Sequence, residues 1–94
     1  MNDNGIITLQ PQKPFWWRAE ADMTVQIQDS EGDFALHEII EAAEHLGSGQ
    51  TISIRLDYEP ELLYRLMDNK GFAHWAQPKS GGWRIDFYKP GRRI

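Results

Sequence analysis

Two histidines and a glutamate occur at spacings that suit metal binding or proton transfer. His37, Glu41 and His45 follow one another at intervals of four, so in a helix they lie on one face. The two histidines would stand about 12 Å apart along the helix axis, too far to bind one ion together. His37 and Glu41 alone supply two ligands where a stable site needs three or four. We therefore interpret this face as solvated and predict no metal site.

A second candidate set is acidic and follows the predicted strands. Asp57 and Glu59 come at the end of one strand, while Asp29 and Asp33 follow an earlier one. Parallel strands bring their carboxyl ends to one edge of a sheet, where ligands of such folds bind. The purely structural interpretation is that these carboxylates cap two helices. A divalent cation or a basic partner surface at this edge is the alternative.

No set of residues has the arrangement of a catalytic site. The sequence contains no cysteine, which excludes thiol nucleophiles, persulfide carriers, disulfides and thiolate metal sites. Its serines lack the context of a Ser-His-Asp triad. We expect a protein without catalytic residues and without a cofactor.

Charge and hydropathy exclude further classes. The 94 residues include 10 Lys and Arg against 14 Asp and Glu, a net charge of −4. This balance makes nucleic acid an unlikely partner, because phosphate neutralisation needs clustered cations. The apolar runs fall far short of the ~20 residues that cross a membrane, and the polar opening lacks the basic segment of a signal peptide. Together with the lack of cysteine, this predicts a cytoplasmic protein.

Hydrophobic periodicity predicts where these candidates lie. Residues 23–28 and 52–56 alternate between apolar and polar types, as half-buried strands do. Between them, residues 34–46 have apolar residues at helical spacing, with Asp33 as the expected N-cap and Gly47 as the C′ residue. A helical crossover between two strands predicts parallel pairing in a right-handed βαβ unit.

The second half of the sequence predicts another helix and a hairpin. Pro60 suits the first position of a helix that runs to Gly71. Aromatic segments at 72–76 and 83–88 then flank a Gly-rich connection at 78–82, which is typical of a hairpin. The order β-α-β-α-β-β predicts an α+β fold, a two-layer sandwich with two helices packed on one face of a mixed four-stranded sheet.

The N-terminal segment differs from this regular pattern. Its prolines interrupt any periodicity, although residues 5–9 have the composition of a short strand. Trp16 and Trp17 are expected to fold back over the open face of the sheet, because an exposed aromatic cluster promotes aggregation. The alternative is an aromatic anchor for another chain. The chain thus divides into an arm, a domain and a basic tail: residues 1–22, 23–89 and 90–94.

Several short motifs resemble a known family. Asp29 and Gly32 have the spacing found at the end of the first strand in the TusA (SirA-like) sulfur carriers. In that family a Cys-Pro-x-Pro motif opens the next helix, and here its positions hold Ala35, Leu36 and Glu38. The resemblance implies a TusA-like topology for residues 23–89. Since Ala35 stands in place of the carrier cysteine, it also implies that the chain does not transfer persulfide.

A closer resemblance is to the related domain of unknown function 2249. The segment from Leu56 to Tyr64 is similar to an Asn-Asp-His-Asp-Pro segment of that family. His37 stands where the family often has a histidine, and Trp83-Arg84-Ile85 resembles its closing strand.

Two functional hypotheses follow. The first is a non-catalytic module that binds another protein through the strand-end edge and the first helix, with Trp16 and Trp17 as further candidate contacts. The second is a regulatory domain that binds a small ligand or a metal through Asp57, Glu59 and His37.

Overall fold

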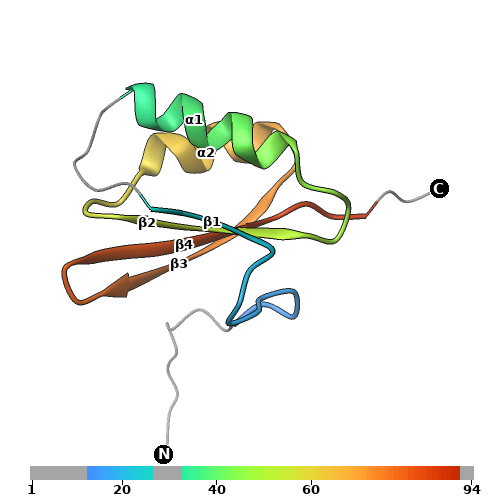
Figure 1. Ribbon diagram of the computed structural model, residues 1–94, viewed down its shortest axis with the longest axis horizontal. Coiled ribbons are helices and arrows are strands. Elements are labelled where there is room, and N and C mark those ends of the chain that lie inside the picture. The colour runs from blue at the N-terminus through green and yellow to red at the C-terminus, as the bar shows by residue number, and fades with distance from the viewer. Residues whose placement is uncertain (1–12, 27–32, 92–94) are drawn as a thin grey trace, which may run out of the picture.

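The computed structural model describes residues 13–26 and 33–91, and its elements follow the predicted order. Both helices lie on one side of the sheet, while the arm passes on the other side (Figure 1). This confirms the predicted α+β fold. In the described ranges, neither helix is long and apolar enough to cross a membrane. The elements are β1 (Met23–Gln26), α1 (Asp33–Glu44), β2 (Thr51–Leu56), α2 (Glu61–Asn69), β3 (Ala73–Lys79) and β4 (Gly82–Tyr88).

The sheet is mixed, as predicted, and its strands are ordered β1-β2-β4-β3. β1 runs parallel to β2, with Met23 opposite Ile52, because α1 carries the chain back to the start of the sheet. β4 pairs antiparallel with both β2 and β3. The carboxyl ends of β1 and β2 therefore meet the β3–β4 turn at one end of the sheet.

The core lies between the helices and one face of the sheet. On β2 and β4, alternate side chains point into this layer and are almost completely buried. α1 and α2 cover them with the apolar stripes that the helical spacing predicted. The most deeply buried core residues are Ile39, Ala43, Ile52, Ile54, Leu63, Met67, Ile85 and Phe87.

The boundaries of the first βαβ unit differ from the prediction. β1 ends at Gln26, and the last two residues of the predicted strand lie outside the described residues. α1 begins at Asp33 itself, so this residue is helical rather than the N-cap. The helix also ends earlier, because the N–H of Leu46 already donates to the carbonyl of Ala43 in a tighter turn, 3.0 Å away. Gly47 is therefore not the C′ residue.

α2 begins one residue later than predicted and ends at Asn69, two residues before Gly71. Pro60 occupies the N-cap position, where its carbonyl accepts the N–H of Tyr64 at 3.2 Å. At the other end Gly71 adopts a φ of 90°, which glycine tolerates without strain. The N–H of Phe72 then donates to the carbonyl of Met67 at 3.0 Å and satisfies one end carbonyl.

The β3–β4 hairpin is tighter than the predicted five-residue connection. Pro78 and Lys79 still belong to β3, where an edge strand accepts a proline, and the loop is Ser80 with Gly81. Gly82 starts β4 against the end of β2. A Cβ at Gly82 would lie 2.3 Å from a backbone carbonyl of that strand, so glycine is required for the close approach.

Candidate binding surfaces

The N-terminal arm packs on the face of the sheet opposite the helices. Trp16 stacks on Tyr88 with ring centroids 5.2 Å apart, and it is only 9% exposed. Trp17 meets Trp75 edge-on, with centroids 5.6 Å apart. The expected fold-back of both tryptophans is therefore present in the structure. Phe15, in contrast, is 92% exposed.

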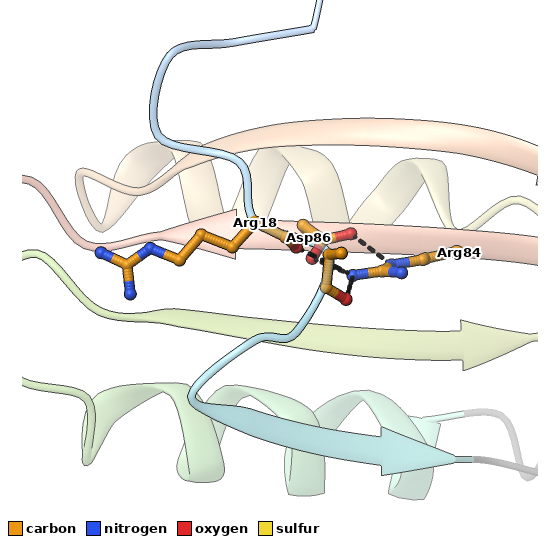
Figure 2. A network of polar contacts seen from close by, with 4 residues as sticks. Arg18, Arg84 and Asp86 are labelled. Carbon is orange, nitrogen blue, oxygen red and sulfur yellow. Dashed lines mark hydrogen bonds and ion pairs between the residues drawn. The ribbon is translucent and has the colours of Figure 1, made fainter.

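Arg84 links the arm to the sheet (Figure 2). Its Nε and Nη2 donate to the two carboxylate oxygens of Asp86 at 2.9 and 3.1 Å, and Asp86 is fully buried. Nη2 also donates to the backbone carbonyls of Arg18 and Ala19, at 3.2 and 3.0 Å. The guanidinium lies 5.0 Å from the ring centroid of Trp17. One side chain thus joins a buried carboxylate, an aromatic ring and two arm carbonyls.

A polar depression occupies the end of the sheet that the sequence favoured for a site. Its volume is about 190 Å³, and it lies where the carboxyl end of β2 meets the β3–β4 turn. Asp57 lines it, as the strand-end argument expected, but two cations that the prediction missed line it too. The lining residues are Gln26, Arg55, Leu56, Asp57, Lys79, Ser80, Gly81, Gly82 and Trp83.

Neither Glu59 of the predicted edge nor His37 of the first helix is among the residues that line this depression. Glu59 instead accepts the hydroxyl of Tyr64 at 3.3 Å. Burial of the phenol and the nearby Glu59 charge raise the pKa of Tyr64 above its usual value. His37 is exposed on α1. Asp29 and the side chain of Asp33 lie outside the described residues.

A second hollow of about 370 Å³ lies on the open face of the sheet, beside the arm. It shares Arg55 with the strand-end depression, so the two hollows adjoin at this side chain and together reach from the arm to the β3–β4 turn. We call the two hollows together the sheet-face groove. The second hollow is lined by Ala19, Glu20, Ala21, Thr24, Ser53, Arg55 and Arg84.

Two arginines stand side by side in the sheet-face groove. Arg55 of β2 is directly opposite Arg84 of β4 in the antiparallel pair. Like charges at such positions repel each other. Asp86 forms an ion pair with Arg84 and not with Arg55. Within the described part of the chain, Arg55 has no carboxylate within 4 Å. Arg55 is exposed, so its charge is accessible in a groove that Asp57 and Glu20 also line.

The histidines form no metal site with their described neighbours. No group of three or more His, Cys, Asp or Glu in residues 13–26 and 33–91 is placed to hold a metal ion. Nδ1 of His45 lies 3.0 Å from the backbone carbonyl of Glu41. His74 stacks on Tyr64 with centroids 4.3 Å apart, and burial lowers the pKa of its ring while the charge of Asp68 partly opposes this.

Comparison with known families identifies the core of this chain. A model of uncharacterized conserved proteins, DUF2249, matches residues 24–89. The chain belongs to the DUF2249 family. The match runs from β1 past the end of β4, so Arg55, Arg84 and Asp86 lie inside the DUF2249 domain and the docked tryptophans lie outside it. No curated protein and no solved structure matches the chain.

Proposed function

We propose that this DUF2249 protein is a non-catalytic module that binds another protein in the cytoplasm, and that it is a cysteine-less relative of the TusA sulfur carriers. The order of its strands and helices supports the TusA relationship. Ala35 follows the start of α1, where a carrier would need its thiolate, and the whole sequence lacks cysteine. A persulfide cannot form without a thiol, so sulfur transfer is not part of the proposed role.

Arg55, which has no carboxylate within 4 Å among the described residues, carries this proposal. Its guanidinium has five donors in a planar fork that matches a carboxylate, and Arg84 directly opposite it is already paired with Asp86. Lys79 adds a second exposed cation at the strand-end depression, where Asp57 is the one carboxylate among the described lining residues. The partner that fits is an acidic segment of another protein, because the groove extends from the arm to the hairpin and offers more than one charged contact.

The test is affinity capture from the native cytoplasm with quantitative mass spectrometry. Arg55→Ser removes the central cation from an exposed position, so the fold should persist. Arg65→Ser is the matched control, because Arg65 is exposed on α2, on the other side of the molecule. A protein captured by the unmodified chain and by Arg65→Ser, but lost with Arg55→Ser and at high salt, would support the proposal.

The same experiment can contradict it. If Arg55→Ser captures the same proteins in the same amounts, the sheet-face groove is not the binding surface. Titration with zinc distinguishes the alternative function, metal binding, from protein binding. A tight stoichiometric zinc complex that is lost in His37→Ala would favour the metal-binding regulatory domain instead.

A further inference from the structure

The outer edge of β1 is a second surface, separate from the sheet-face groove. β1 is the first strand of the sheet, and among the described residues it pairs with β2 alone. An edge strand has backbone N–H and C=O groups that can pair with a further chain. The four residues of β1 are long enough for a short added strand.

A shallow, open hollow lies beside this edge, between Val25 of β1 and α1. Its volume is about 420 Å³, and we call it the edge groove. Half-buried Val25 and Ala42 form an apolar floor, while exposed Glu38, Glu41 and His45 form the rim. The four α1 positions lie on one face of the helix, because they follow each other at intervals of three, one and three. The edge groove thus combines an apolar floor with an acidic rim.

The charge of α1 determines what this groove can hold. The helix contains no Lys or Arg, so Glu38 and Glu41 have no cation on their own element. A second copy of this chain paired edge to edge would bring four carboxylates together, which like-charge repulsion disfavours. A segment with basic residues would instead bring positive charge to the rim. Complementary charge therefore favours a basic partner over self-association.

We propose that the β1 edge and the edge groove bind an extended, basic segment of another protein, which adds a strand to the sheet beside β1. Side chains alternate along a strand, so those at every second position face the helix layer. The segment that fits has an apolar residue over Val25 and Ala42, with Lys or Arg two positions before and after it. The long stems of these residues cover the groove wall while their charges reach Glu38 and Glu41.

This proposal is independent of the sheet-face groove. The edge groove shares no lining residue with either hollow of the sheet-face groove, and it attracts the opposite charge. Loss of binding at one surface would leave the other proposal unchanged.

The probe is a capped synthetic peptide in which Lys, Val and Lys occupy alternate positions with Thr between them. A permuted peptide of the same composition has the valine shifted by one position, which moves it to the opposite face from the lysines. A third peptide has Glu in place of Lys. Binding is measured by titration calorimetry, and its location by NMR shift changes of the backbone amides on the full-length chain.

We expect the alternating peptide to bind at β1 and α1 and to bind more tightly than both controls. Replacing Glu38→Gln and Glu41→Gln together should weaken binding about threefold to tenfold, with the fold checked by circular dichroism. Glu61→Gln is the control, because this exposed acid lies on α2 and does not line the edge groove.

Five results would overturn the proposal, four of them from the measurements above. These are no binding of the alternating peptide, equal binding of the permuted peptide, an unchanged affinity in the double variant, and shifts confined to the sheet-face groove. Affinity that develops only after residues 1–12 are removed would also overturn it, because the edge would then be occupied by the chain's own N-terminal segment.

Discussion

Removal of one indole tests whether the docked arm contributes to the stability of the domain. Trp16 is nine-tenths buried against Tyr88, while its neighbour Phe15 is almost completely exposed. The pair offers a matched comparison of two adjacent aromatic residues. We expect Trp16→Ala to destabilise the protein and Phe15→Ala to leave its stability nearly unchanged.

The expected magnitude follows from the area that Trp16 buries. An indole with about 200 Å² of surface, nine-tenths of it buried, contributes up to about 4 to 5 kcal/mol at 25 cal/mol per Å². Alanine retains part of this area, and a compact unfolded chain already buries some of it. The expected loss in unfolding free energy is therefore about 2 to 3 kcal/mol. Phe15→Ala should change it by about 0.5 kcal/mol or less.

Trp16→Ala cannot destabilise the protein by more than the free energy with which the arm docks on the sheet. This free energy is therefore an upper limit on the expected loss. Nε1 of Trp17, Nε1 of Trp75 and Nε2 of Gln77 are buried without a hydrogen-bond partner among the described residues. Each unpaired donor costs free energy when the arm docks. The ordering of the arm backbone opposes docking as well. A loss near the lower end of the range is thus consistent with a docked arm.

The assay is urea unfolding followed by far-ultraviolet circular dichroism, which reports the sheet and helices rather than the indole itself. The free energies of the two variants are compared with that of the unmodified chain. Equal stabilities of Trp16→Ala, Phe15→Ala and the unmodified chain would refute the reasoning, because the arm would then contribute nothing in solution.

Two further predictions concern charged groups. Asp86→Ala should cost about 3 to 5 kcal/mol in unfolding free energy, because it leaves the Arg84 guanidinium, itself 13% exposed, without its carboxylate. Urea unfolding measures this loss. The double variant Arg84→Leu with Asp86→Leu should recover part of it, because neither charge is then left unpaired. A double variant less stable than Asp86→Ala would contradict this account. Burial lowers the pKa of His74 in the folded state below the unfolded value of about 6.5. The contribution of the neutral ring to stability is therefore present above about pH 6.5 and is lost as the pH falls through the folded pKa. His74→Phe keeps the stacking on Tyr64 and should lose less stability between about pH 7.5 and pH 5 than the unmodified chain, whereas identical pH dependence would show that His74 is not responsible.

The local pattern of the sequence determined the elements and their inward faces. The period of two in β2 and the helical spacing in α1 depend on which side of each element is apolar, and this information is local. The predicted ends of the helices and strands were less accurate, because alternative turns can end an element one or two residues earlier or later. Leu46 shows this, since its N–H bonds three residues back and ends α1 before Gly47. The chemistry that the chain lacks was also decided locally, because no arrangement of residues restores a thiol where Ala35 stands.

The binding surfaces were decided by the tertiary structure. Alternation along β2 and β4 placed Arg55 and Arg84 on the open face, but only the strand register put one directly opposite the other. The contact between Arg84 and the carbonyl of Arg18 joins residues 66 positions apart, and no local propensity specifies such a pair. Asp57 lines the strand-end depression as predicted, but Glu59 of the same edge and His37 of the first helix do not, for the same reason. Positions that are close in the sequence set the shape of an element, whereas the meeting of side chains from different elements depends on how the whole sheet and arm pack.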